Sequence, residues 1–197
     1  MTSVYDIRED IDISSVLPDV LSRLPVWRLQ SALSYRQEID RFLCAKSFLM
    51  LEEMLRENYG LDYCPEFSYE SNGKPYLLEY PDIFFNISHC RKGIAVVVSD
   101  SPAGIDIEEI QYDENLAPVI LNPEELAAVK GAEQKDVKFT SFWTLKESFL
   151  KLTGEGIKDN MKNVLSEVDG VNFTTEVRCP EGYVLSLATK TRSTFFL

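Results

Sequence analysis

Two long helical patterns, each followed by short strand-like segments, constrain the fold of this chain more than any other feature. Apolar residues recur at three- and four-residue steps over about 35–58 and again over about 134–153, and Gly60 and Gly154 mark plausible helix ends. The order of helix and then strands therefore occurs twice. It predicts an α+β fold of two similar α/β halves in one chain, residues 1–103 and 104–197, with the active site at their interface.

The segments that follow each helical pattern read as short strands separated by turns. Those after the first pattern are 67–70, 76–79, 83–88, 94–99 and 104–108, and those after the second are 164–168, 171–177 and 183–189. A further helix is predicted to start at Asn122-Pro123, with asparagine as the N-cap and proline at the first helical position. The first thirty residues, which contain Pro18 and Pro25, are predicted to form strand fragments and loops.

The composition argues against several classes of protein. A net charge of −12 and a sequence pI near 4.6 argue against a partner that is a nucleic acid or an anionic membrane surface. The longest apolar runs are too short to span a bilayer, and the chain does not open with a secretory signal. Four irregularly spaced cysteines then favour reduced thiols in a cytoplasm, and the single histidine, His89, excludes zinc sites built from several histidines.

The segment Gly104-Ile105-Asp106-Ile107-Glu108 places two carboxylates two residues apart in a short apolar run. Because side chains alternate between the faces of a strand, Asp106 and Glu108 are expected to point the same way. Two neighbouring carboxylates repel unless positive charge lies between them, and Mg²⁺ is a common cation for such oxygen ligands. The alternative is an edge strand with one solvated face.

A second candidate lies on the helix predicted over 134–153. Trp143, Glu147 and Lys151 stand four residues apart and so share roughly one helical face. This pattern also fits a simple Glu147–Lys151 pair on a solvated face. The bulky apolar residues around it indicate a largely buried helix, where charged side chains normally have a partner or a function.

Two shorter motifs carry weaker signals. Ser88 and His89 follow a strand pattern and can donate hydrogen bonds to phosphate oxygens, although a lone histidine at a strand end is more often an ordinary polar residue. The turn Gly73-Lys74-Pro75 is by itself commonplace, with a solvated lysine. The order and combination of the four motifs are much more specific than any one of them.

The order G-K-P, F-N-I-S-H, G-I-D-I-E and W-x-x-K-E-S-x-x-K, with G-x-G beyond it, resembles that of the 4′-phosphopantetheinyl transferases. Chain length and motif spacing are similar to the pseudodimeric type that activates surfactin and other peptide synthetases. The resemblance implies transfer of the phosphopantetheine arm of coenzyme A to a serine of an apo acyl or peptidyl carrier protein. Adenosine 3′,5′-bisphosphate would be released.

The resemblance also implies roles for individual residues. Asp106, Glu108 and Glu147 would hold Mg²⁺ against the coenzyme A pyrophosphate, and Glu147, directly or through a metal-bound water, would act as the base for the serine hydroxyl. Lys151 would stabilise charge as the leaving group departs. The residues expected to contact coenzyme A are Arg41, Gly73, Lys74, Pro75, Ser88 and His89. Weaker candidates are Arg36 for the 3′-phosphate and Glu125 near the metal.

Two other functions use the same motifs. A metal-dependent phosphohydrolase could use the three carboxylates with water as nucleophile, but it would have no need of the G-K-P turn. A carrier-binding module without activity would be expected to show a broken ligand set. The leading expectation is a monomeric cytoplasmic enzyme that docks its carrier through an apolar patch near 112–120.

Overall fold

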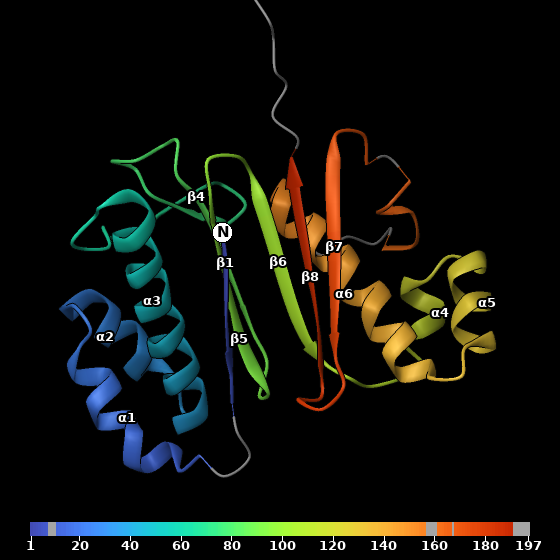
Figure 1. Ribbon diagram of the computed structural model, residues 1–197, viewed down its shortest axis with the longest axis horizontal. Helices are drawn as coiled ribbons and strands as arrows, with labels where there is room; N and C mark the ends of the chain where they lie inside the picture. The colour runs from blue at the N-terminus through green and yellow to red at the C-terminus, as the bar shows by residue number, and fades with distance from the viewer. Residues whose placement is uncertain (8–10, 157–160, 167, 191–197) are drawn as a thin grey trace, which may run out of the picture.

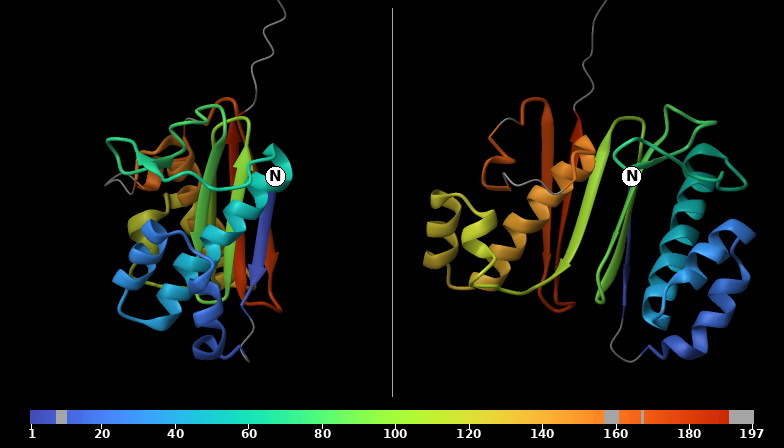
Figure 2. Two further views of the ribbon diagram at one scale, coloured as in Figure 1. Left: turned by 90° about the vertical axis from the view of Figure 1, so that its left-hand side faces the viewer. Right: turned by 180° about the vertical axis from the view of Figure 1, so that it is seen from behind.

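The computed structural model describes residues 1–7, 11–156, 161–166 and 168–190, and it contains two three-stranded sheets that lie between two groups of helices (Figure 1). The two further views place the helices of the first half on one side of the sheets and those of the second half on the other (Figure 2). The coarse prediction of a mixed helix-and-sheet fold is therefore confirmed. Within the described ranges, no helix combines the length and the apolar character that crossing a membrane requires.

The first sheet has the antiparallel strand order β1-β5-β4 and packs against α3. Its apolar core joins β4 and β5 to α1, α2 and α3. The elements in this part of the chain are β1 (Thr2–Asp6), α1 (Ile13–Ser22), α2 (Val26–Ser34), α3 (Glu38–Tyr59), the two-residue strands β2 (Ser68–Tyr69) and β3 (Pro75–Tyr76), β4 (Phe84–His89) and β5 (Gly93–Ser99).

The second sheet has the antiparallel order β6-β8-β7 and packs against α6. Helices α4 and α5 lie beside α6 at the end where it begins (Figure 1). The elements are β6 (Ala103–Glu109), α4 (Ala117–Ile120), α5 (Pro123–Gly131), α6 (Lys135–Thr153), the 3₁₀ turn η1 (Met161–Asn163), β7 (Val171–Arg178) and β8 (Tyr183–Lys190).

The two sheets meet where β4 lies beside β6. The backbone N–H of Ile105 donates to Asn86 Oδ1 over 2.9 Å, and that of Ile107 donates to Ser88 Oγ over 3.3 Å. Side chains of one sheet thus satisfy backbone groups of the other, as buried backbone requires. Buried residues of both sheets form an apolar cluster between them: Cys90, Ala95, Val97, Ala103, Ile105, Ile107, Tyr183 and Leu185.

Local sequence signals explain the ends of the long helices. Gly60 (φ +67°) and Gly154 (φ +74°) adopt the left-handed conformation just after α3 and α6, a conformation that favours glycine at helix C-termini. At the start of α5, Asn122 accepts from the backbone N–H of Glu125 and the Glu125 carboxylate accepts from that of Asn122. The predicted ends at Gly60 and Gly154 and the predicted start at Asn122 are confirmed.

The prediction for the first thirty residues was largely wrong, because β1 is followed by the helices α1 and α2. Pro25 occupies the N-cap of α2, where a helix needs no N–H donor. Pro18 lies inside α1, but the carbonyl that would have bonded its N–H belongs to the exposed residue Ser14, which water can reach. Prolines alone did not exclude helices here.

The strand predicted over 164–168 was also wrong. Residues 164–166 form turns after η1, in which Val164 and Ser166 donate backbone N–H groups to Met161 and Asn163, three residues earlier. Residue 167 lies outside the described part of the chain. The predicted strands 67–70 and 76–79 are present only as the two-residue strands β2 and β3, and residues 77–79 are not in a strand. The remaining predicted strands are present, with ends that differ by at most one residue.

Candidate functional site

A cavity of about 440 Å³ lies where β4, β6 and α6 come together with α2 and α3. Most of the residues singled out from the sequence line it. They are Pro75, Ser88, His89, Asp106, Glu108, Trp143, Glu147 and Lys151. The walls also include aromatic side chains of the first half, so the cavity is neither wholly polar nor wholly apolar.

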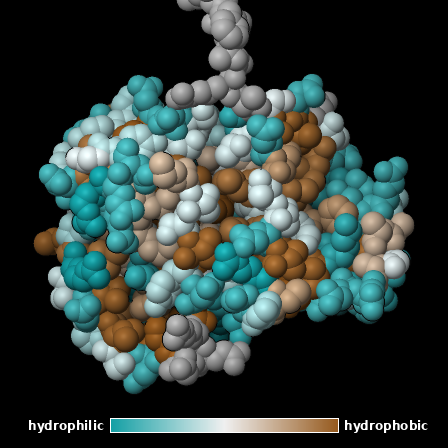
Figure 3. Space-filling view, in the orientation of Figure 1, coloured by the Kyte–Doolittle hydropathy of each residue, from teal (hydrophilic) through white to brown (hydrophobic). Residues whose placement is uncertain are grey.

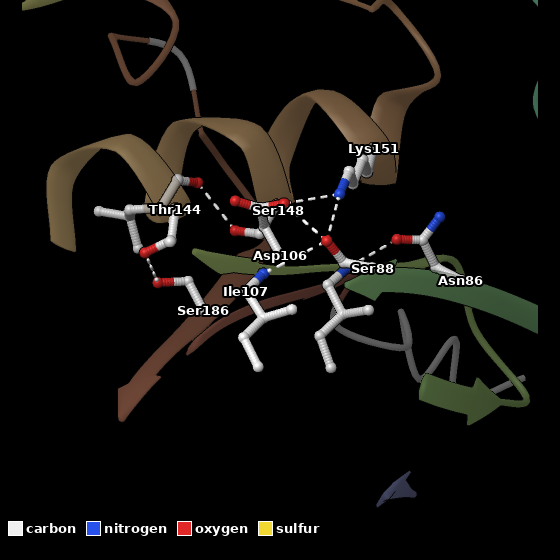
Figure 4. Close-up of polar contacts among 10 residues, drawn as sticks. Asn86, Ser88, Asp106, Ile107, Thr144, Ser148, Lys151 and Ser186 are labelled. Carbon is white, nitrogen blue, oxygen red and sulfur yellow. Dashed lines mark hydrogen bonds and ion pairs between the residues drawn. The ribbon is translucent and has the colours of Figure 1, made fainter. Parts of the chain in front are cut away.

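The floor of the cavity contains a buried charged network (Figure 4). Asp106 on β6 is only 2% exposed, and its Oδ1 accepts a hydrogen bond from Lys151 Nζ at 2.6 Å and one from Ser88 Oγ at 2.9 Å. Lys151 Nζ also donates to Ser88 Oγ at 2.8 Å. Three residues far apart in the sequence therefore meet around one carboxylate oxygen.

Two carboxylate oxygens of this network have no hydrogen-bond partner among the residues that the structure describes. They are Asp106 Oδ2 and Glu147 Oε1, and both are buried. Burial, followed by the charge of Asp106, raises the pKa of Glu147 above its ordinary value. Buried acceptors without partners are costly, and a small cation would provide a partner for these oxygens.

Glu108 is the third carboxylate of the group. Burial and then the negative charge of Asp106 raise the pKa of Glu108 to about 7, while a hydrogen bond from the Trp143 side chain acts in the opposite direction. Trp143 stands one turn before Glu147 on α6, so the tryptophan links the strand carboxylate to the helix carboxylate. The predicted shared face of Trp143, Glu147 and Lys151 is thus the face that lines the cavity.

The donor set fits a hard divalent cation in its chemistry. It offers carboxylate oxygens only, two of them buried and unpartnered, which is the ligand type that Mg²⁺ prefers. Across the parts of the chain that the structure describes, no three His, Cys, Asp or Glu side chains already surround one point as a formed metal site. Binding would therefore require small movements of these carboxylates.

Ser88 and His89 occupy different environments at the end of β4. Ser88 is buried within the charged network, whereas the His89 side chain is exposed at the cavity wall. Desolvation and then the nearby Lys151 ammonium lower the pKa of His89 below its ordinary value. A largely neutral His89 can still donate one hydrogen bond to an anionic group.

The G-K-P turn lines a second cavity, of about 220 Å³, that shares Pro75, Glu147 and Lys151 with the first. Gly73 and Lys74 lie on its wall, opposite Gly154 at the end of α6. The two cavities therefore flank the same charged residues of α6.

Arg41 is not among the residues that line either cavity. Its Nε donates to the backbone oxygen of Tyr35 at 2.9 Å, and Tyr35 does line the larger cavity. Arg41 thus lies at the rim rather than in the wall. Arg36 is exposed and also outside the lining.

Arg28 of α2 is the cavity residue that the sequence did not single out. Its Nη2 donates to the backbone oxygen of Cys44 at 3.0 Å, and its guanidinium stacks over the rings of Phe48 and Phe67 at 5.6 and 5.7 Å. Arg28 Nε is buried and unpartnered. Its position depends on the packing of α2 on α3, so no local pattern distinguished it from Arg23 or Arg36.

The expectation that Glu125 lies near the metal is not supported by the structure. Glu125 Oε2 forms an ion pair with Lys146 Nζ at 2.7 Å, away from the cavity lining. Lys146 is fully buried and does not line the cavity, and its ammonium also donates to the backbone oxygens of Ile120 and Met161 at 2.9 and 2.8 Å. The pair fixes the α4–α5 segment and η1 against α6.

Replacing Lys146 by methionine is expected to lower the free energy of unfolding by about 3–5 kcal/mol, because the change removes the ion-pair partner of the largely buried Glu125 carboxylate and the ammonium donor to the Ile120 and Met161 carbonyl groups. Urea denaturation would measure the change. Lys130→Met, an exposed lysine in the last turn of α5, is the matched control and should change stability by less than about 0.5 kcal/mol. Equal stability of the two variants would contradict this role of Lys146.

Comparison with known proteins relates this geometry to a family. Residues 102–187, which include β6, α6 and the carboxylates they carry, match the family model described as the 4′-phosphopantetheinyl transferase superfamily. This part of the chain is similar to that superfamily. The resemblance inferred from the motif order is confirmed.

Curated relatives agree with this assignment. The 4′-phosphopantetheinyl transferase psf-1 of Bacillus pumilus is 39% identical over 113 residues, which cover 55% of this chain and 48% of the relative. The 4′-phosphopantetheinyl transferase Sfp of Bacillus subtilis (strain 168) is 32% identical over 114 residues, 55% of this chain and 50% of the relative. The 4′-phosphopantetheinyl transferase HetI of Nostoc sp. is 36% identical over 101 residues, which cover 47% of this chain and 43% of the relative. The chain matches these relatives over about half of their length.

Proposed function

We propose that this chain is a Mg²⁺-dependent 4′-phosphopantetheinyl transferase that moves the phosphopantetheine arm of coenzyme A to a serine of an apo acyl or peptidyl carrier protein. The observation that carries the proposal is the pair of unpartnered buried oxygens on Asp106 and Glu147 beside the Lys151 ammonium, inside the segment that matches the superfamily. This arrangement offers a cation site, a base and a fixed positive charge within one cavity.

Asp106, Glu108 and Glu147 are the proposed ligands of the cation. When bound, Mg²⁺ would neutralise charge on the pyrophosphate oxygens and align them for in-line attack. Lys151 now pairs with Asp106 Oδ1, which leaves Oδ2 of Asp106 and Oε1 of Glu147 as the acceptors that a cation would use.

The chain's own side chains would handle the proton and the leaving group. Burial raises the pKa of Glu147, which suits this residue to take the proton of the carrier serine. As the proton leaves, the serine oxygen forms a bond to the phosphorus of the phosphopantetheine phosphate. The bond from that phosphorus to the bridging oxygen breaks, and adenosine 3′,5′-bisphosphate leaves. Lys151 would stabilise the negative charge that develops on the departing oxygen.

Contacts to coenzyme A are assigned to the cavity walls. Ser88 and His89 would contact phosphate oxygens, and the turn Gly73-Lys74-Pro75 would line the site beyond α6. Arg41 at the rim remains a proposed contact to the 3′-phosphate. Arg28 joins this set, because its guanidinium group lines the larger cavity and carries the positive charge that an anion there would need.

The proposal includes the organisation of the whole protein. The site would be formed between two similar α/β halves, so one chain would suffice and the enzyme would act as a monomer in the cytoplasm. Residues near 112–120 would contact the carrier through a small apolar patch.

The test is incubation with coenzyme A, Mg²⁺ and each of several apo carrier proteins, followed by mass spectrometry. A carrier should gain the mass of one phosphopantetheine arm and adenosine 3′,5′-bisphosphate should accumulate. Hydrolysis of coenzyme A without a carrier would instead support a phosphohydrolase. Absence of both products, despite coenzyme A binding measured by calorimetry, would refute the proposal.

Replacing Arg28 by methionine is expected to raise KM for coenzyme A roughly 10-fold or more with little change in kcat, because a charge-assisted hydrogen bond to an anion is worth about 1.5–3 kcal/mol. Methionine keeps much of the packing on Phe48 and Phe67. Steady-state kinetics measure the effect. The control is Arg23→Met, an exposed arginine outside the cavity, and an equal rise of KM in both variants would contradict a direct contact.

Mg²⁺ affinity is expected to fall as the pH drops below about 7, because the pKa of Glu108 is raised to about 7 and the cation must compete with a proton for this carboxylate. Calorimetric Mg²⁺ titration at pH 6, 7 and 8 without coenzyme A measures the dependence. In the variant Glu108→Gln, binding should be weaker and flatter across this range. An affinity that is constant from pH 6 to pH 8 in the unmodified protein would remove Glu108 from the ligand set.

A further inference from the structure

The C-terminal end of α6 is in direct contact with the turn between β2 and β3. Lys74 Nζ donates to the backbone oxygen of Leu152 at 2.9 Å, across 78 positions of sequence. This carbonyl belongs to the last turn of the helix, whose oxygens have no N–H partner within the helix. A cation at this end is also favoured by the helix dipole. The Lys74 ammonium therefore caps α6 from another part of the chain.

Side chains of the same turn lie close to Gly154, the residue that ends α6. A Cβ added to Gly154 would lie 2.5 Å from Asn72 Nδ2 and 3.5 Å from Lys74 Cδ. The turn is held in shape by its own contacts, since Asn72 Oδ1 accepts the backbone N–H of Lys74 at 2.9 Å. Two independent contacts, one polar and one steric, thus join the turn to the helix end.

Strand β6 also contacts the same helical turn. Gly104 of β6 lies so close to α6 that an added Cβ would overlap the backbone of Ser148 and Leu152. The last turn of α6 is therefore packed against both β6 and the Asn72–Lys74 turn. Lys151 belongs to this turn, and Glu147 precedes it by about one turn.

We propose that Lys74 is a positioning residue, which holds the last turn of α6 in place so that Lys151 and Glu147 keep their positions above Asp106. The proposal rests on the transferase function proposed above. It differs from the direct phosphate or adenine contact expected of this lysine, because Lys74 would act through α6. Its partial burial at the helix end lowers the pKa of the ammonium below its ordinary value.

The proposal predicts how a Lys74 variant differs kinetically from a variant of a substrate contact. A misplacement of about 1 Å at reacting groups can cost on the order of 100-fold in rate. Loss of the hydrogen bond from Lys74 to the backbone oxygen of Leu152 should therefore lower kcat and leave KM for coenzyme A nearly unchanged. Loss of a phosphate contact should instead raise KM, as described for Arg28.

The experiment compares Lys74→Met, Lys74→Arg and the control Lys130→Met in the full chain. Each is measured for kcat, for KM of coenzyme A and for hydrogen exchange of the amides of residues 150–155. Lys74→Met should lower kcat by roughly 10- to 100-fold, change KM less than about 3-fold and speed exchange at the end of α6. Lys74→Arg keeps a donor for Leu152 and should recover most of the rate, and Lys130→Met should match the unmodified protein.

The results that would overturn the proposal are distinct. A raised KM with unchanged kcat and unchanged exchange would assign Lys74 to substrate binding, and no change in any readout would remove it from the site. Absence of carrier modification by the unmodified protein would refute the transferase function. Even then, the exchange measurement would decide independently whether Lys74 holds the end of α6.

Discussion

Replacing Glu147 by glutamine is expected to reduce carrier modification by roughly 10³-fold or more without lowering the thermal stability of the protein. Glutamine keeps the shape of the side chain but cannot accept the proton of the carrier serine, and it is a weak ligand for a hard cation. The loss of activity should persist at any practical Mg²⁺ concentration. Carrier modification followed by mass spectrometry would measure it.

The effect on stability follows from the environment of Glu147. Its carboxylate is buried, Oε1 has no partner, and burial together with Asp106 raises its pKa above the unfolded value near 4.5. Ionisation of such a group opposes folding. It therefore lowers the free energy of unfolding of the unmodified protein as the pH rises above the unfolded pKa. The melting temperature of Glu147→Gln minus that of the unmodified protein should therefore become larger as the pH rises from 5 to 8.

The matched control is Glu53→Gln, an exposed glutamate on α3. It should leave both activity and the pH dependence of the melting temperature unchanged. Strong activity in Glu147→Gln would exclude Glu147 as the base. A melting temperature that falls in this variant would show that the carboxylate makes a stabilising contact instead.

Replacing Gly104 by alanine is expected to lower the free energy of unfolding by at least about 3 kcal/mol and to abolish activity with it. The added Cβ would overlap the backbone of Ser148 and Leu152 and lie 2.9 Å from Leu152 Cα. Backbone atoms of a packed helix cannot rotate away as the end of a flexible side chain can. Either β6 and α6 separate, which moves Asp106 away from Lys151, or the variant does not fold.

Gly131→Ala provides the control for this variant. Gly131 ends α5, and a Cβ there would meet no atom within 4 Å. This change should be neutral or stabilise the protein by up to about 1 kcal/mol, since alanine loses less backbone entropy on folding. Urea denaturation and circular dichroism would compare the two. A Gly104→Ala variant as stable as Gly131→Ala would contradict the close approach of β6 to α6.

The surface gives much weaker functional information than the cavity. In the space-filling view, apolar residues are visible in separate small groups between hydrophilic ones (Figure 3). The large exposed apolar residues, such as Val26, Leu78 and Val119, come from different elements. Scattered exposed apolar residues are normal on soluble domains and need no partner to explain them.

Features that depend on a few neighbouring residues were predictable. Apolar periodicity located α3 and α6, glycines after them set their ends, and the Asn122 capping box started α5. The strand period placed Asp106 and Glu108 on one face of β6, and the helix period placed Trp143, Glu147 and Lys151 together on α6. Proline content misled the prediction for the first thirty residues because both prolines lie where the structure can accommodate them.

By itself, therefore, the sequence determined which residues share a strand or a helical face, since that depends on the backbone repeat alone. Only the tertiary structure decided that Lys151 pairs with Asp106, that Arg28 rather than Arg41 lines the cavity, and that Lys74 caps α6. It also assigned Glu125 to the buried partner Lys146 rather than to the metal. These choices join residues 16 to 78 positions apart, and packing between elements, not a local repeat, determines which polar groups meet.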